Sequence, residues 1–510
     1  MRVELSADAR GTPTTVPPLK PAERRSPSAT VARGALALLS TQPLTWATSL
    51  AAAVLLPRYL GDQGFGQLSM ALNISVLVGM VALFGVPTYL RRRVATEPAC
   101  AALYGTGALV ILLVAGLLLS VGLTLALWWL GLPIARDGVL PLAFVCMAVS
   151  CAASILFSLL IGLERHTRFA WLNAGTDVCV RGACLVVVVA GASLPIYFAT
   201  AAVVATIALL LGWYTSGIGL QRAALTPKVL RELLHGGSTF LAWSVVTQIR
   251  NQSDVILIGI FLSEQAAGWL SAAYRIISIP TFIPTAIITP LLPALTRSAD
   301  DAVEFRHTLR RSLEMTLLLT VPAAMFIVAL ASAVPEILHW GPSFQHAVPL
   351  MTILAFQQPI MGTDLVLGTA LMALHDERRW LRVLAIAATF NVGMNLLLMP
   401  IFERWLQNGA IAAAVVEVAT ELIMLGGALI LLPRGTLDRQ VALTSGRVAL
   451  AGLALLAVTM PLHSVSVPLA IAAGGATYVA VAMGLGVLRA ADLQALRCTV
   501  VQRLSRGASL

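Results

Sequence analysis

Apolar runs of about 20 residues, the length that a helix needs to cross a bilayer, follow one another along most of the chain. Hydrophobic residues make up 58% of the 510 residues and charged residues 11%, and the mean hydropathy is +0.86. This is more apolar surface than soluble cores can bury. The sequence therefore predicts an all-α polytopic membrane protein. We expect about 14 transmembrane helices, which begin near Gly34, Leu68, Gly107, Val139, Ala170, Pro195, Gly237, Trp269, Ser312, Ala347, Trp380, Ala410, Arg447 and Val467.

The basic residues predict how these helices are oriented. If the N-terminus is cytoplasmic, 28 of the 34 Lys and Arg residues fall on the cytoplasmic side, three in external loops and three inside spans. Short cytoplasmic loops carry an excess of positive charge, so we expect an even number of helices and two cytoplasmic termini. The formal net charge of +10 follows from this topology and from attraction to anionic lipid headgroups. It does not indicate binding of nucleic acid.

The connectors are too short to form a soluble domain. The expected regions are a disordered cytoplasmic tail at 1–33, an N-lobe of helices 1–6 at 34–219, a cytoplasmic linker at 220–236, a C-lobe of helices 7–12 at 237–433, helices 13 and 14 at 447–488, and a cytoplasmic tail at 489–510. No HExxH, Walker or GxSxG motif is present, and the six cysteines lack metal-ligand spacing. We expect no catalytic residue, no metal site and no cofactor.

An internal repeat relates the two halves. The stretch LGDQGFGQLSMAL from Leu60 aligns without a gap with LSEQAAGWLSAAY from Leu262, and six of the thirteen positions are identical. The register of 202 residues spans six predicted helices, so both copies have the same direction in the membrane. This predicts two parallel six-helix lobes, related by an axis along the membrane normal, plus two C-terminal helices.

Two longer runs resemble a known family. They are LLPRYLGDQGFGQLSMALNISVLVGMVALFGVPTYLRRRVA from Leu55 and SDVILIGIFLSEQAAGWLSAAYRIISIPTFIPTAIITPLLPALTR from Ser253. Both are similar to the polysaccharide transporter (oligosaccharide flippase) family of the multidrug/oligosaccharidyl-lipid/polysaccharide flippase superfamily. The resemblance implies a bacterial inner-membrane flippase for lipid-linked oligosaccharides, which works by alternating access between two lobes.

Eight ionisable residues fall inside predicted spans. Each would cost about 2.5 to 3.5 kcal/mol if it faced lipid at the bilayer centre. We therefore expect these residues to face protein or a hydrated cavity. Two opposite-charge pairs are four residues apart and can bridge on one helix face, either as structural pairs or as part of a site. The eight are Asp177, Arg181, Arg250, Asp254, Arg275, Asp364, Glu417 and Glu421.

A lipid-linked oligosaccharide would need two kinds of contact. A pyrophosphate suits Arg forks, and sugar hydroxyls suit amides and other neutral polar groups. Each amide could instead form only an interhelical hydrogen bond. The substrate-binding candidates are Asn73, Arg181, Arg250, Asn251, Gln252, Asp254, Arg275, Gln357, Asn391 and Asn395.

Three acids are candidates for ion coupling. Glu417 and Glu421 share one face of predicted helix 12, where burial and mutual repulsion disfavour two negative charges. Asp364 in predicted helix 10 is the third candidate and has no charged neighbour in the sequence. The alternative is that these carboxyls are protonated and static.

Other functions compete with the flippase interpretation. A cation-coupled multidrug antiporter would share the lobes, and so would a lipid II flippase. The lipid II branch typically has cations in helix 1, and here that helix has none. A membrane polymerase or glycosyltransferase would need larger loops. The expected partners are the lipid-linked oligosaccharide, membrane lipids, and a polysaccharide polymerase and glycosyltransferases; we expect a monomer.

Overall fold

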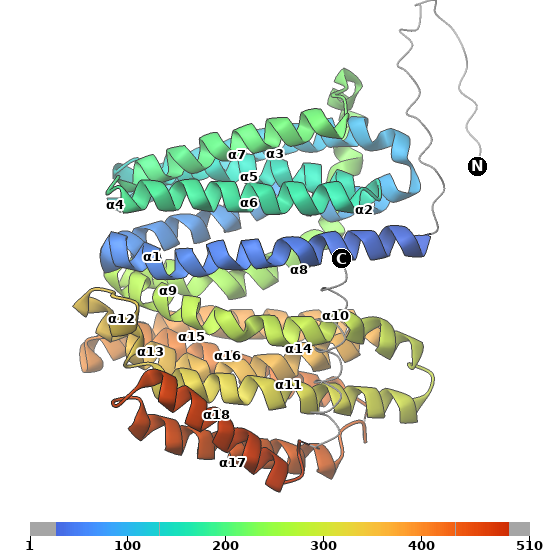
Figure 1. Cartoon of the computed structure of the whole chain (residues 1–510). Helices are drawn as coiled ribbons and strands as arrows, with labels where there is room; N and C mark the ends of the chain where they lie inside the picture. Colours follow the sequence, from blue (N-terminus) through green and yellow to red (C-terminus); the bar gives the residue numbers. More distant parts are fainter. Residues whose placement is uncertain (1–26, 132, 434, 489–510) are drawn as a thin grey trace, which may run out of the picture.

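The computed structural model describes residues 27–131, 133–433 and 435–488, and all regular elements in these ranges are helices (Figure 1). Residues 1–26 of the predicted N-terminal tail and the predicted tail 489–510 lie outside the described residues. The α-helices are α1 (Pro27–Leu83), α2 (Val86–Thr96), α3 (Ala101–Trp129), α4 (Pro133–Arg136), α5 (Val139–Gly162), α6 (His166–Val189), α7 (Leu194–Ser216), α8 (Pro227–Phe261), α9 (Glu264–Ser278), α10 (Phe282–Arg297), α11 (Ala302–Leu330), α12 (Val334–Ile337), α13 (Ala347–Ala355), α14 (Gln357–Ala373), α15 (Glu377–Leu406), α16 (Ala410–Leu431), α17 (Arg439–Leu462) and α18 (Val467–Gly484).

Twelve helical segments of the described chain are long and apolar enough to cross a membrane. One of them, Ser40–Leu83, is 44 residues long and contains two predicted spans. The charged helix α8 is not among the twelve, although it occupies the place of predicted helix 7. If the long segment is counted as two spans and α8 is added, the prediction of about fourteen helices is confirmed.

The helices form the two predicted lobes. In Figure 1, α1 to α7 make up one bundle and α8 to α16 the other, and α17 and α18 lie on the outer side of the second bundle. The last pair packs against α11, where the Tyr478 hydroxyl donates to the Leu318 carbonyl at 2.7 Å. The helix axes run roughly parallel, so each bundle presents its connectors at two opposite ends.

These two ends differ in charge. One end, seen on the right of Figure 1, carries α2 with Arg91, Arg92 and Arg93 and the connection between α10 and α11; we call it the arginine-rich face. The other carries α4 and α12, and we call it the arginine-poor face. The charge rule predicts that the arginine-rich face is cytoplasmic.

A single glycine separates the first two spans. Gly61 has φ 67° and ψ −178°, a backbone conformation that is open almost only to glycine, and it interrupts the regular geometry of α1 at the arginine-poor face. Two spans within one continuous run of sequence therefore fold back on each other.

Two spans of the C-lobe are broken. The span at the second repeat copy divides into α9 and α10 at a 3-10 turn, Ile279–Thr281, and Pro280 lies at the start of that turn. The span predicted as helix 10 divides into α13 and α14 at Phe356. The prolines of predicted helix 8 therefore mark a real break, as expected for residues that remove a backbone donor.

Hydrophobic packing joins the lobes mainly at one end, and at the other end α8 enters the core of the N-lobe through Leu233. Toward the arginine-poor face, one core contains residues of both lobes, among them Phe65, Leu68, Leu270 and Leu350. Toward the arginine-rich face there are two further cores. One is built mainly from α1, α2, α3 and α5, and the other from α10, α11, α14, α15 and α16. The lobes thus share a core at the arginine-poor face and are packed separately toward the arginine-rich face.

The start of α8 is the main exception at the arginine-rich face. Its Gly237 packs so closely on Phe84 and Gly85 that a side chain on Gly237 would overlap the Phe84 carbonyl oxygen. Nearby, Tyr89 of α2 donates to Glu232 of α8 at 3.4 Å. Burial and, after it, the Glu232 carboxylate raise the pKa of Tyr89, so the phenol keeps its proton as a donor.

Candidate functional site

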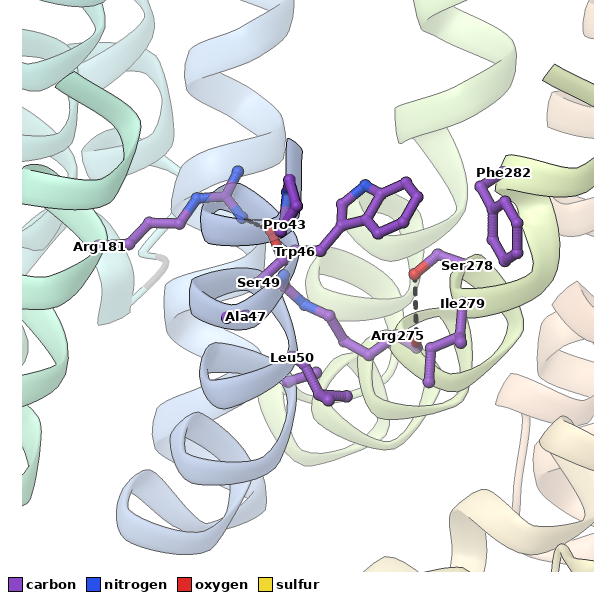
Figure 2. Close-up of a pocket in the computed structure, with 11 residues that line it drawn as sticks. Pro43, Trp46, Ala47, Ser49, Leu50, Arg181, Arg275, Ser278, Ile279 and Phe282 are labelled. Atoms are coloured by element: carbon purple, nitrogen blue, oxygen red, sulfur yellow. Dashed lines mark hydrogen bonds between the residues drawn. The ribbon is translucent and has the colours of Figure 1, made fainter. Parts of the chain in front are cut away.

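A cavity of about 680 Å³ lies between α1 and the junction of α9 and α10, where the two lobes meet. We call it the arginine pocket, because Arg181 of α6 and Arg275 of α9 line it from different lobes. In Figure 2 both side chains extend from opposite sides toward the stretch of α1 that holds Ser49. Arg181 donates to the Ser49 hydroxyl, and its Nε atom lies 2.8 Å from Oδ1 of Asp177. The predicted bridge between Asp177 and Arg181 is confirmed.

Arg275 gives this pocket an excess of positive charge. Among the described residues its guanidinium has no ion-pair partner and no hydrogen-bond partner, although the side chain is half-buried. Arg181 is near enough for its like charge to act on Arg275. Two guanidinium groups therefore line the same space, and only that of Arg181 has a carboxylate partner, Asp177, in the described chain. Such a space favours an anion that offers several acceptor oxygens.

The rim of the arginine pocket is apolar. Trp46 of α1 and Phe282 of α10 face each other there, with ring centroids 5.5 Å apart. They are 55% and 52% exposed although both belong to membrane spans, and Leu50 and Ile279 beside them are also exposed. Exposed apolar side chains within membrane spans are suited to contact with acyl chains, so the rim can accommodate a lipid chain beside the charged interior of the pocket.

A second cavity, of about 510 Å³, adjoins the first and shares Arg275 and Ser278 with it. We call it the polar pocket. The other lining residues that offer polar groups are Ser69, Asn73, Arg250, Asn251, Gln252, Ser271, Tyr274 and Glu417, from α1, α8, α9 and α16. The Ser271 hydroxyl is buried and has no hydrogen-bond partner in the described chain. The two pockets together run from a lipid-facing rim to a polar interior.

Four buried carboxyl groups lie behind the polar pocket within the C-lobe. We call them the acid cluster: Asp254, Asp364, Glu417 and Glu421, each at most 5% exposed. Arg250 binds two of them, with Nη1 2.7 Å from Glu421 Oε1 and 3.4 Å from Glu417 Oε1. Asp364 lies within hydrogen-bonding range of Glu421.

Uncharged donors also bind oxygens of Glu417 and Asp254 in this cluster. Gln357 Nε2 donates to Glu417 at 2.8 Å, and Asn391 Nδ2 donates to its other oxygen at 3.0 Å. Asp254 accepts from Asn395 at 2.8 Å and from the Tyr274 hydroxyl at 2.7 Å. These bonds connect α8, α9, α14, α15 and α16 inside the C-lobe.

Some oxygens of the acid cluster remain without a donor. Oδ2 of Asp364 and Oε2 of Glu421 are buried and have no hydrogen-bond partner in the described residues, and neither has Oε1 of Gln357. Burying four negative charges against a single guanidinium would be very costly. The arrangement is suited to hold protons or a small cation.

The structure divides the predicted substrate-binding residues between two places. Arg181 and Arg275 line the arginine pocket, and Arg275 also lines the polar pocket together with Asn73, Asn251 and Gln252. Four other candidates do not line either pocket. Asp254, Gln357, Asn391 and Asn395 are buried among the acids of the C-lobe.

One expectation about charge pairing was wrong, and one acid has a neighbour in the fold that it lacks in the sequence. Arg250 does not pair with Asp254 on its own helix; it pairs with Glu417 and Glu421 of α16, because those carboxylates face it across the C-lobe. Asp364 does not stand alone, since folding brings α14 against α16 and places it beside Glu421. Spacing along one helix predicted neither contact.

Sequence reasoning missed several residues that line the pockets. Trp46, Phe282 and Ser49 were not singled out, and nothing in the pattern separates them from other residues of a membrane span. Ser69 and Ser271 are different, because they occupy matched positions in the repeat and both line the polar pocket. The repeat could have identified that pair.

Comparison with known proteins agrees with this architecture. A solved lipid II flippase, MurJ in an inward closed conformation, has the same fold with a TM-score of 0.67 and 14% identity, over 88% of this chain and 98% of that one. An inward-facing MATE family transporter of the MOP superfamily matches with a TM-score of 0.59 and 11% identity, over 79% and 98%. At these identities the likeness concerns the fold alone.

Curated relatives match part of the chain. The probable low-salt glycan biosynthesis flippase Agl15 of Haloferax volcanii is 25% identical over 267 residues, 52% of this chain and 54% of the relative. The probable lipid II flippase MurJ of Haemophilus influenzae is 30% identical over 170 residues, 30% of this chain and 33% of the relative. The chain thus spans about half the length, or less, of the curated relatives it matches.

Two parallel lobes around a charged cavity define a multi-pass membrane protein with the fold of the MOP superfamily. The model of one family, described as polysaccharide biosynthesis protein, matches residues 31–299. The chain belongs to this family.

Proposed function

We propose that this protein is a flippase that moves a polyprenyl-pyrophosphate oligosaccharide across the bacterial inner membrane by alternating access, for the synthesis of a surface polysaccharide. Family membership and the flippases among the relatives support a transporter rather than an enzyme. Both termini lie in the cytoplasm in this proposal, with the arginine-rich face inward.

The observation that carries the proposal is the pair of arginines from opposite lobes in one lipid-facing pocket. The substrate has three chemically distinct parts, and the two pockets offer a matching environment for each. Arg181 and Arg275 bind the pyrophosphate, and the Trp46 and Phe282 rim leaves the polyprenyl chain in lipid. The glycan occupies the polar pocket, where Asn73, Gln252 and other polar groups can bind hydroxyls.

Arg181 also bears on the type of glycolipid. Predicted helix 1 contains no cation, which differs from the pattern typical of lipid II flippases. Arg181 reaches from α6 to Ser49 on that helix, so a guanidinium does stand beside helix 1. In this chain, the positive charge beside helix 1 is therefore supplied by Arg181 of α6.

The test is flipping of a fluorescent polyprenyl-pyrophosphate oligosaccharide by purified protein in liposomes. We expect Arg275→Ala to lower the rate about tenfold or more, because hydrogen bonds to a charged group contribute about 1.5 to 3 kcal/mol. Arg275→Lys should recover only part of the rate, because it keeps the charge and loses the bidentate fork. Arg404→Gln, at an exposed position in the α15 end, is the matched control and should flip at the original rate.

Two results would contradict the proposal. One is undiminished flipping by Arg275→Ala. The other is a protein that extrudes cationic drugs and flips no glycolipid, which would favour the multidrug antiporter.

For energy coupling we infer that the acid cluster exchanges protons or a small cation during the transport cycle. Its donor-free oxygens and its excess of carboxyls over guanidinium support this inference. Glu417 both lines the polar pocket and binds Arg250, so the cluster borders the space that the substrate would occupy.

A further inference from the structure

The two copies of the internal repeat touch each other at the arginine-poor face. Gly66 and Gly268 hold the same position in the two copies, and their backbones are in contact. A Cβ atom on Gly66 would overlap the carbonyl oxygen of Glu264, and one on Gly268 would overlap that of Asp62. Asp62 and Glu264 are themselves matched positions of the repeat, so the contact has approximate two-fold symmetry.

Hydrogen bonds between the lobes follow the same symmetry. Gln67 Nε2 donates to Glu264 Oε2 at 2.8 Å, and Trp269 Nε1 donates to Asp62 Oδ2 at 3.2 Å. Gln67 and Trp269 are again matched positions, 202 residues apart. In each lobe, therefore, an acid accepts a bond from the other lobe, the glycine four residues later touches the other lobe, and the residue after that glycine donates a bond back.

We propose that these six residues, three from each copy, form the gate that closes the arginine-poor face and separates when the transporter opens to that side. We call them the symmetric latch. The proposal rests on the alternating access of the proposed function. It adds the location of one gate and the residues that hold it shut.

The position of the latch supports this role. Ser69 and Ser271 lie one helical turn further along the two copies and line the polar pocket, so the latch covers that pocket from the arginine-poor side. The latch belongs to the end where the lobes share one core, while they are packed separately toward the arginine-rich face. Separation of the latch would expose the polar pocket at the arginine-poor face.

The first experiment introduces a single methyl group. Gly66→Ala cannot fit against the Glu264 backbone, so we expect it to hold the latch open. Gly64→Ala is the matched control, because a Cβ there meets only Leu60, four residues earlier in the same lobe, at 3.4 Å. Gly237→Ala disturbs another tight backbone contact between the lobes, at the opposite face, and controls for general loosening.

The readout is a reporter cysteine, Ser69→Cys, labelled by a membrane-impermeant maleimide applied to the arginine-poor side of spheroplasts. Protein with the native cysteines alone gives the background. We expect labelling to rise several-fold with Gly66→Ala and to stay at the reference level with both controls. No rise with Gly66→Ala, or an equal rise with Gly64→Ala, overturns the latch. Because no substrate is added, this result does not depend on which molecule is transported.

A second experiment does not disturb the backbone. Gln67→Cys with Glu264→Cys places two thiols at the ends of an observed side-chain bond, and a short bis-thiol reagent joins them. We expect the cross-linked protein to stop flipping and a reductant-cleavable linker to restore the rate on cleavage. A cross-linked protein that flips at the original rate refutes the gate. If Gly66→Ala raises the labelling of Ser69→Cys as expected while the protein flips no glycolipid even without the cross-link, the latch stands and the proposed substrate is wrong.

Discussion

Arg250 forms ion pairs that its neighbours along the sequence do not predict. Its guanidinium is buried between Glu417 and Glu421, and not beside Asp254. Removing one partner of a buried ion pair leaves a charge without compensation, at a cost of about 3 to 5 kcal/mol. Arg250 is therefore first of all the counter-ion of the acid cluster.

We expect Arg250→Ala to lower the thermal unfolding temperature of the purified protein markedly. The double variant Arg250→Ala with Glu421→Gln should recover part of the loss, because it also removes the charge that lacks a partner. Glu421→Gln alone should cost less than Arg250→Ala, because Arg250 keeps Glu417. Additive losses in the double variant would show that the two side chains are not coupled.

At the scale of elements, Gly61 determines that the first two spans are separate helices. Its φ of 67° and ψ of −178° lie in a region that costs other residues about 1 to 3 kcal/mol. We expect Gly61→Ala to lower stability by about that amount, measured as a loss of monodisperse protein after heating. Gly64→Ala, three residues later in regular helix, should leave stability unchanged or slightly higher. Equal losses in both variants would mean that the turn does not require glycine.

The elements also show why the sequence predicted the fold better than the site. Apolar run length predicted the spans, and the internal repeat predicted the parallel lobes, because both patterns can be found in the sequence without knowledge of contacts between helices. Prolines marked both breaks in the C-lobe: Pro280 lies in the turn Ile279–Thr281, and Pro359, three residues after Phe356, removes the donor that would bind the Ala355 carbonyl. The acid cluster depends on contacts between helices more than 100 residues apart in sequence, such as that of Arg250 with Glu421. Spacing along one helix carries no information about such contacts.

At the scale of the whole molecule, the acid cluster and the pockets have to act together for an ion gradient to drive transport. Glu417 is the link, because it lines the polar pocket and binds Arg250 of the cluster. A proton or cation that enters the cluster therefore changes the charge next to the substrate. A transporter that uses this link should lose gradient dependence when the carboxyls are removed.

We expect Glu417→Gln with Glu421→Gln to abolish the difference in flipping rate between liposomes with and without a proton or sodium gradient. Residual flipping without a gradient should persist, because the arginine pocket is intact. Glu403→Gln, outside the acid cluster at the end of α15, controls for loss of a carboxyl elsewhere. Unchanged gradient dependence in the double variant would show that Glu417 and Glu421 take no part in energy coupling.

The contact of Gly66 with Gly268 bears on how a chain with two repeated halves can evolve. In a chain built by duplication, positions on the symmetry axis meet their own counterparts, as these glycines do. A single-copy ancestor that paired as a symmetric dimer would have needed only one small residue to make both sides of that junction. After fusion the two sides were free to diverge, and one now presents a glutamine where the other presents a tryptophan, Gln67 and Trp269.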